Sequence, residues 1–332
     1  MKKFISVLIF LFLFFNSVYA RELWYEDNNM GKAGGYPKDF IEKFEKTEKW
    51  KNSLKCIDVY MIRANVLKQF DENFYKKIFK PFLDNYKIKL AIDVGGATWT
   101  QYGNRMRIKE EELNLFKRLK EYNIIPCCII LQSVLDKPLK EGDGKEIDYP
   151  IDRRIQDIAQ YIKDVKKLFP NISVGLIDAT PSHGKDYKRN YLLLVNHLKK
   201  ENLKLDYILL DTTFNLLKSR KNNMSWYKAI EIEEFVKKEL GLKFGVFVTS
   251  RAAGYKSNRD FFEDVSTFAD CYYSAKGNSD FYIISSWFPY PDQTIPEECA
   301  NDYPVMCTVL EFCNKVKHFK FNTKNLNKRC NL

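Results

Sequence analysis

Three aspartates lie where short apolar runs of the chain end. They are Asp93, Asp178 and Asp211, in the runs 89–94, 172–180 and 206–213. Runs that are short, apolar and bounded by polar residues are typical of buried strands. Carboxylates at the carboxyl ends of parallel strands often build the active site of an α/β fold. The pattern therefore predicts a site at one edge of a parallel sheet, with Asp178 and Asp211 on adjacent strands.

Further polar and aromatic residues are expected at or just beyond the same strand ends. They are Tyr60, Arg63, Trp99, Gln132, His183, Arg251 and Trp287. Indole rings can stack on the apolar face of a pyranose, while acids, amides and arginine can bond its hydroxyl groups. Two carboxyl groups that flank a glycosidic bond can cleave it, about 5 Å apart for retention or roughly 6.5–9.5 Å for inversion. We therefore expect Asp178 and Asp211 to be catalytic, and Asp93 and the seven other residues to bind the sugar.

The same residues leave other roles open. An aspartate at a strand end often only caps the next helix, and Trp287 fits a lid on the core as well as a sugar platform. A Mg²⁺ or Ca²⁺ site on the three aspartates is a further alternative, because these ions take oxygen ligands. The chain has three histidines and no Gly-x-Gly-x-x-Gly, Walker A or Gly-x-Ser-x-Gly motif. We expect no cofactor and no histidine-rich metal site.

Strand and helix signals alternate along the chain, in steps of about 34 residues. Expected strands begin near residues 56, 89, 124, 173, 206 and 243, with a weak one at 271–274 and a last one at 281–287. The strongest helix signal is the apolar stripe of residues 151–168, which Pro170 ends. Parallel βα units at this spacing predict a (β/α)8 barrel over residues 56–319, with an open doubly wound sheet as the alternative. Residues 21–55 are expected to form an N-terminal extension, and residues 56–332 the barrel domain with its C-terminal helix.

Residues 1–20 have the pattern of an export signal. Lys2 and Lys3 precede a continuous apolar stretch, and small residues precede an expected cut after Ala20. An uncleaved membrane anchor is the alternative, but no later segment is long and apolar enough to span a bilayer. We therefore expect a secreted or periplasmic protein with no integral membrane segment after cleavage.

The formal net charge of the 332-residue chain is +11 at pH 7. Loss of the two lysines in the signal would leave +9, which could suit nucleic acid, an anionic membrane or an acidic polysaccharide. The lysines are spread out, however, and alternate with acids on helical stretches such as 109–120, which is typical of solvated helix faces. We expect no nucleic-acid partner.

All eight cysteines lie beyond the export signal, and an even number permits disulfides in an exported chain. Four of them crowd the C-terminal region, so at least one bridge is expected there. Cys127 and Cys128 lie in an apolar run, where adjacent side chains should point to opposite faces. At least one of these two is expected to be a buried free thiol.

With these residues in view, residues 56–319 resemble secreted (β/α)8 glycoside hydrolases. The resemblance rests on Asp93, Asp178, Asp211 and the Ser-Ser-Trp sequence at 285–287 that closes the last strand. It implies a barrel that cleaves or binds a carbohydrate or polysaccharide at the C-terminal ends of its strands. The commonest clan of these enzymes has glutamates after two strands, whereas no expected strand of this chain ends in glutamate. A glycosidase, a non-catalytic glycan-binding barrel and a metal-dependent hydrolase using the three aspartates therefore all remain open.

Overall fold

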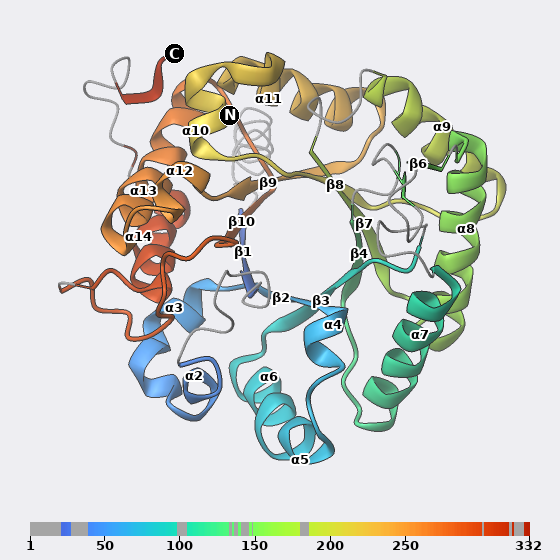
Figure 1. The fold of residues 1–332 in the computed structure, drawn as a ribbon, viewed down its shortest axis with the longest axis horizontal. Helices are drawn as coiled ribbons and strands as arrows, with labels where there is room; N and C mark the ends of the chain where they lie inside the picture. The colour runs from blue at the N-terminus through green and yellow to red at the C-terminus, as the bar shows by residue number, and fades with distance from the viewer. Residues whose placement is uncertain are drawn as a thin grey trace, which may run out of the picture.

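Eight parallel strands close into a barrel with helices around it, which is the (β/α)8 architecture and excludes the open sheet (Figure 1). The computed structural model describes residues 21–27, 39–97, 105–132, 135, 139–140, 146–147, 149–179, 186–300, 302–318, 321 and 329–332. The barrel order is β1-β10-β9-β8-β7-β4-β3-β2. The barrel strands are β1 (Glu22–Asp27), β2 (Val59–Arg63), β3 (Lys89–Val94), β4 (Cys128–Gln132), β7 (Ser173–Asp178), β8 (Tyr207–Leu210), β9 (Lys243–Val248) and β10 (Phe281–Ser285).

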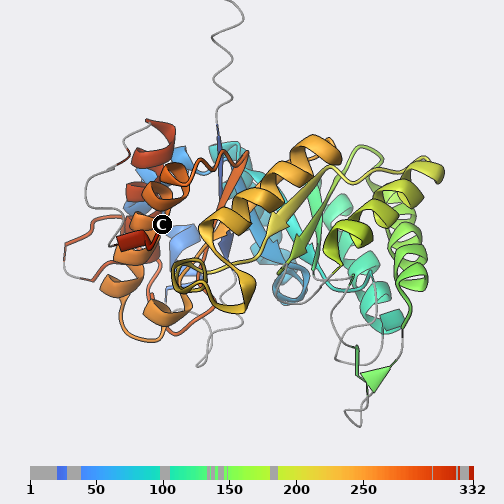
Figure 2. The ribbon, with the colours of Figure 1, turned by 90° about the horizontal axis from the view of Figure 1, so that it is seen from above.

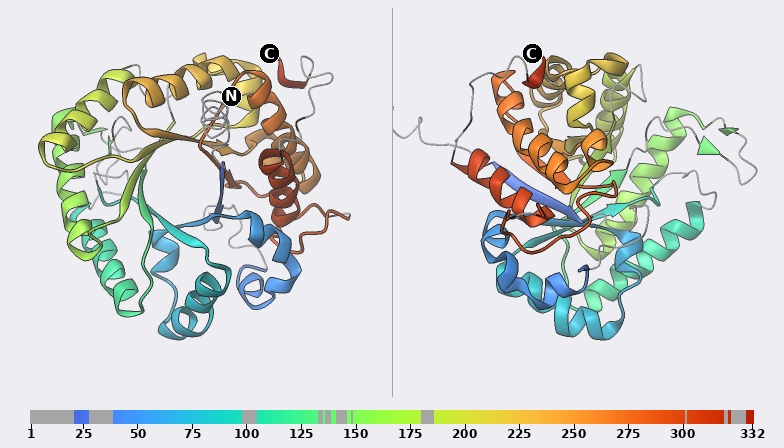
Figure 3. Two further views of the ribbon diagram at one scale, coloured as in Figure 1. Left: turned by 180° about the vertical axis from the view of Figure 1, so that it is seen from behind. Right: turned by 60° about the vertical axis from the view of Figure 1, so that its left-hand side comes forward.

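Each barrel strand is followed by helical structure that packs on the outside of the barrel. The α-helices are α2 (Glu42–Glu45), α3 (Lys51–Cys56), α4 (Ala64–Leu67), α5 (Glu72–Phe74), α6 (Lys80–Tyr86), α7 (Arg105–Glu121), α8 (Ile151–Leu168), α9 (Tyr187–Lys200), α10 (Phe214–Ser219), α11 (Trp226–Glu234), α12 (Arg251–Gly254), α13 (Asn258–Ser274) and α14 (Val305–Lys317). Short 3₁₀ or π segments are η2 (Thr47–Trp50), η3 (Tyr75–Phe79), η4 (Lys221–Asn223) and η5 (Phe235–Glu239). The helices α13 and α14 lie side by side and complete the ring (Figure 3).

The long insertion after β4 carries a two-stranded antiparallel pair, β5 (Leu139–Lys140) and β6 (Glu146–Ile147). This pair projects away from the body of the barrel (Figure 2). Among the described residues, no helix has the length and apolar character needed to cross a membrane.

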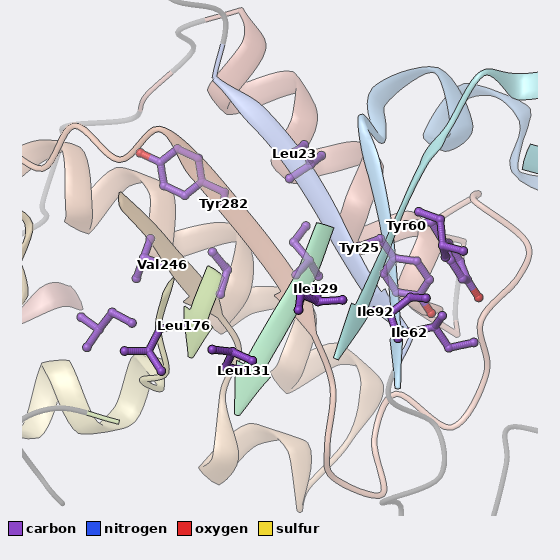
Figure 4. Packing of buried hydrophobic residues seen from close by; sticks show 14 of the residues in the cluster. Leu23, Tyr25, Tyr60, Ile62, Ile92, Ile129, Leu131, Leu176, Val246 and Tyr282 are labelled. Atoms are coloured by element: carbon purple, nitrogen blue, oxygen red, sulfur yellow. The ribbon is translucent and has the colours of Figure 1, made fainter. Parts of the chain in front are cut away.

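Alternation along each strand divides the buried residues into two layers. Residues such as Met61, Ile130 and Leu209 pack against one another inside the barrel. Their neighbours along the strands pack outward against the helices, and Figure 4 shows several of them, including Ile62, Ile129 and Leu176. Strands buried on both faces read as continuous apolar runs, which is why the sequence revealed most of them.

The first strand was placed wrongly from the sequence. The barrel begins with Glu22–Asp27, which pairs with β10 on one side and β2 on the other, rather than with residues 56–62. This strand has acids at both ends and only three apolar residues between them, so it lacks the apolar signature of the others. Part of the segment 21–55 is therefore inside the barrel, and the expected first strand is the second.

The weak strand expected at residues 271–274 is also wrong, because these residues form the last turn of α13. Cys271 and Tyr272 are buried on the same helix face as Val265 and Phe268. Their apolar character comes from helical packing, and β1 is the eighth strand of the barrel. The helix predicted at 151–168 is confirmed as α8.

Candidate active site

Polar side chains from most of the barrel strands point inward at the carboxyl ends. Side chains two residues apart along a strand point to the same face of the sheet. Each of these polar residues comes two positions after a residue of the inner layer. Glu26 follows Trp24, Arg63 follows Met61, Asp93 follows Ala91 and Gln132 follows Ile130. The same period places Asp211, Thr249 and Ser285 above Leu209, Phe247 and Ile283. We call this ring of inward polar residues the mouth.

Glu26 lies at the seam where the last strand meets the first. The residue is 2% exposed, and its carboxylate accepts a hydrogen bond of 2.9 Å at Oε2 from the indole Nε1 of Trp287. Burial raises the pKa of Glu26, while the charge of Arg63 and the bond from Trp287 act in the opposite direction. The ring of Trp287 also packs on Phe247, with 5.4 Å between ring centroids.

Asp93 forms an ion pair with the guanidinium group of Arg63. The residues Arg63 and Asp93 are direct partners in the pairing of β2 with β3, and Arg63 Nε lies 3.2 Å from Asp93 Oδ2. Burial raises the pKa of Asp93 to about 7, and Arg63 offsets only part of this effect. Its second oxygen, Oδ1, has no hydrogen-bond partner among the residues that the structure describes. Asp93 is therefore a carboxyl group that can gain or lose a proton near neutral pH.

The turn that follows Asp93 is held by a buried glutamate on α7. The carboxylate of Glu112 accepts backbone hydrogen bonds from Gly95 (2.8 Å) and Gly96 (3.0 Å). A Cβ atom on Gly96 would lie 2.6 Å from this carboxylate, so glycine permits the close approach. The turn that follows Asp93 is thus held by hydrogen bonds to a buried carboxylate.

The expected catalytic pair, Asp178 and Asp211, is not brought together. Asp178 pairs in register with Leu210, so Asp211 stands one residue further along and on the opposite face of the sheet. Asp178 points outward and accepts a hydrogen bond of 2.9 Å from the hydroxyl of Tyr191 on α9. Asp211 is half-buried on the inner face, and its backbone N–H donates to the carbonyl of Asp178. A one-residue offset in register thus separates the two carboxylates.

The other predicted site residues divide between the two faces. Arg63, Gln132 and Trp287 lie at the mouth, each half-buried. Tyr60 faces the helices instead, and its hydroxyl donates a hydrogen bond to Asp27. Arg251 is exposed at the start of α12. Trp99 and His183 lie outside the described residues.

Glu26 was missed because residues 21–55 were expected to form an extension, and a glutamate does lie at the end of a strand. The signal was present in Glu-Leu-Trp-Tyr-Glu-Asp at 22–27, where Glu26 follows the inward-facing Trp24 by two residues. Asp27, next in the chain, points outward and pairs with the buried Lys43. Two neighbouring acids at one strand end therefore serve opposite faces of the sheet.

The described residues contain no group of three or more His, Cys, Asp or Glu side chains arranged to hold a metal ion. The three aspartates of the alternative metal site are divided, because Asp178 faces α9 while Asp93 and Asp211 face inward. The acids at the mouth are instead organised around Arg63.

No family model and no curated protein sequence matches this chain. Its fold does match solved structures. A mutant of P. fluorescens subsp. cellulosa xylanase A in complex with xylopentaose aligns at a TM-score of 0.56 and 9% identity, covering 88% of this chain and 97% of that one. A GH10 endoxylanase from a sugarcane soil metagenome aligns at 0.52 and 10% identity, covering 89% and 97%. A psychrophilic glycoside hydrolase family 10 endo-beta-1,4-xylanase aligns at 0.52 and 12% identity, covering 81% and 87%. At these identities the likeness is one of fold alone.

Proposed function

We propose that this protein is an exported glycoside hydrolase that acts on a glycan bound at the mouth of the barrel. The observation that carries the proposal is the buried cluster of Glu26, Arg63 and Asp93, with the indole of Trp287 against it. Buried carboxyl groups with raised pKa values are common where acid–base chemistry takes place. The fold that the chain shares with xylanases supports the same class of substrate.

Glu26 and Asp93 suit two different roles in glycosidic bond cleavage. Asp93, with a pKa of about 7, can be protonated near neutrality and act as the acid toward the leaving oxygen. Burial also raises the pKa of Glu26, but Arg63 and Trp287 oppose this rise, so we assign Glu26 as the base that takes a proton from the attacking water. The two acids thus differ in their neighbours, and different environments can give two carboxyl groups different roles in one reaction.

The two acids project inward from strands that are not neighbours. They lie on β1 and β3, with β2 between them, so their backbones are two strand spacings or about 9–10 Å apart. The stereochemical outcome depends on the separation of the carboxyl groups themselves, about 5 Å for retention or roughly 6.5–9.5 Å for inversion. Gln132 and Asp211, on the inner face of other strands, would bond sugar hydroxyls.

Export of the protein is supported by its disulfides. Cys56–Cys313, Cys271–Cys330 and Cys299–Cys307 are bonded, and such bonds persist mainly in oxidising compartments. The bond Cys299–Cys307 confirms the expected bridge in the C-terminal region. The export signal at residues 1–20 lies outside the described residues and remains a prediction.

A panel of xylo-, cello- and manno-oligosaccharides incubated with the purified protein tests the proposal. We expect product release, with kcat lowered about a hundredfold or more in Glu26→Gln and in Asp93→Asn, because each removes one half of the acid–base pair. Glu22→Gln, at the opposite end of the same strand as Glu26, is the matched control and should keep full activity. Unchanged kcat in both mouth variants would refute the mechanism.

Calorimetry and product analysis together distinguish catalysis from binding alone. If calorimetry detects sugar binding that Trp287→Ala abolishes, but no product forms with any bound sugar, the barrel is a non-catalytic glycan-binding protein. If neither binding nor product is found across the panel, the carbohydrate proposal itself fails.

A further inference from the structure

Two free thiols lie side by side at the end of the barrel opposite the mouth. Cys127 and Cys128 stand at the start of β4, and their Sγ atoms are 3.0 Å apart. The other six cysteines are all in disulfides, so this pair alone remains reduced. The expectation that adjacent side chains here point to opposite faces is wrong, because the chain bends at Cys127 before β4 begins.

A pocket of about 370 Å³ opens onto this pair of thiols. It lies among the first residues of the strands, and Lys89, Lys204 and Lys243 line it together with the carboxylates of Glu22 and Asp206. Cys127 is half-buried and Cys128 is 2% exposed. A small molecule in the pocket can therefore reach Cys127 first, with Cys128 directly behind it.

The pocket is separated from the mouth by an aromatic layer inside the barrel. The rings of Trp24, Tyr207 and Phe281 contact one another, with centroids 5.2–5.7 Å apart. A Cβ atom at Gly175 would lie 2.2 Å from the Tyr207 ring, so glycine on β7 makes room for this layer. Chemistry at the two thiols is thus physically separate from the sugar site.

We propose that Cys127 and Cys128 form a redox-active dithiol that reacts with small-molecule disulfides entering this pocket. The Cys127 thiolate attacks one sulfur of the disulfide RSSR, forms a mixed disulfide with it and releases RS⁻. The Cys128 thiolate then attacks the Cys127 sulfur and expels the second RS⁻. The two cysteines are oxidised to a bond between adjacent residues, RSSR is reduced to two thiols, and both cysteine protons pass to the thiolates released.

The geometry suits a reversible reaction better than a permanent cross-link. The sulfur atoms need to approach by only about 1 Å to reach the S–S bond length of about 2.05 Å. Adjacent Cα atoms are about 3.8 Å apart, closer than the roughly 4.4–6.8 Å of ordinary disulfides, so the bond would be strained and readily reduced. Strained disulfides are the labile or regulatory ones.

The second cysteine is also suited to act after the first. Burial raises the pKa of Cys128, and the neighbouring Cys127 raises it further. The nucleophile of the first step is therefore Cys127, which is also the more exposed of the two thiols. Once Cys127 is in a mixed disulfide it no longer carries a thiol, so its contribution to the pKa of Cys128 is removed.

Oxidised glutathione added to the purified, disulfide-bonded protein tests this proposal, with intact mass and peptide mapping as readouts. We expect the wild type to lose two hydrogens and form the Cys127–Cys128 bond without retaining glutathione. Cys128→Ser should retain one glutathionyl group at Cys127, because it lacks the thiol that expels it. Cys127→Ser should stay unmodified, because Cys128 is buried. Thiols in the wild type that remain fully open to alkylation after treatment would overturn the proposal, as would equal reaction of Cys127→Ser.

A measurement on the unaltered protein guards against loss of folding in the variants. Phenylarsine oxide bridges two thiols held close together, so we expect one equivalent to block alkylation of both Cys127 and Cys128. Dithiothreitol should then restore both thiols. Failure of the arsenical to protect the pair would show that the two sulfurs do not act together.

Discussion

The indole Nε1 of Trp287 lies 2.9 Å from Oε2 of Glu26 and joins the end of the last barrel strand to the end of the first. Glu26 is also the register partner of Ser285, two residues before Trp287. Glu26 and Trp287, which lie near opposite ends of the chain, are therefore in direct contact where the first and last strands meet. The consequences of this contact for the proposed site can be measured.

Replacement of Trp287 by phenylalanine should make the ionised form of Glu26 less stable, while keeping an aromatic ring against Phe247. A hydrogen bond to a charged group contributes about 1.5–3 kcal/mol. Its loss raises the pKa of Glu26, so kcat/KM at neutral pH should fall about tenfold or more and the acid limb of the pH–rate profile should move to higher pH. The same change in a Glu26→Gln background should add little, and an equal loss in both backgrounds would show that Trp287 acts by another route.

Asp93 should govern the alkaline limb of the pH–rate profile. If its neutral form donates a proton, kcat/KM falls as pH rises through about 7, the pKa that burial gives this carboxyl. Asp93→Asn should abolish both activity and this limb, while Asp84→Asn, an exposed change on α6, should alter neither. Activity that is flat between about pH 6 and pH 8 would remove Asp93 from the role of acid.

The same proton should also appear in the stability of the fold. Because the native state holds the Asp93 proton more tightly than the unfolded chain does, the contribution of Asp93 to stability is full below about pH 4 and is lost as pH rises through about 7. Urea unfolding at several pH values should show the difference between the wild type and Asp93→Asn shrinking, or reversing, over this range. A difference that is independent of pH would mean that Asp93 is ionised throughout.

Asp178 should matter for stability rather than for catalysis. It lies under α9 and accepts a hydrogen bond from Tyr191, so Asp178→Asn and Tyr191→Phe should each lower the free energy of unfolding by about 1–3 kcal/mol. The kcat of the folded variants should stay within a few-fold of wild type, whereas Asp211→Asn should weaken sugar binding without loss of stability. A hundredfold loss of kcat in Asp178→Asn with unchanged stability would instead support the pair expected from the sequence.

The buried ion pair of Lys43 and Asp27 should be the most sensitive structural feature near the mouth. Both side chains are fully buried, and the hydroxyl of Tyr60 also donates to Asp27. Lys43→Met leaves a buried carboxylate without its cation and should lower the free energy of unfolding by about 3–5 kcal/mol. The double variant Lys43→Met/Asp27→Asn should recover part of this loss in urea unfolding. A double variant as unstable as Lys43→Met would show that lost packing, rather than lost charge pairing, is the cause.

The sequence by itself determined the class of the fold. Seven of the eight strands are apolar runs because both of their faces are buried, and the helix at 151–168 carries a continuous apolar stripe. These are local patterns with fixed periods, so they can be found without knowing what packs against them. The same reasoning placed Arg63, Asp93 and Trp287 at strand ends, where the structure has them.

Only the tertiary structure decided which of these residues meet. The strand Glu22–Asp27 has too few apolar residues to stand out, and it is fixed by pairing with β2 and β10 on either side. The register of β7 with β8 turned Asp178 toward α9, because a shift of one residue moves a side chain to the other face. A bend in the chain likewise brought Cys127 and Cys128 together. Register and closure arise between segments distant in sequence, so no single stretch of the chain encodes them.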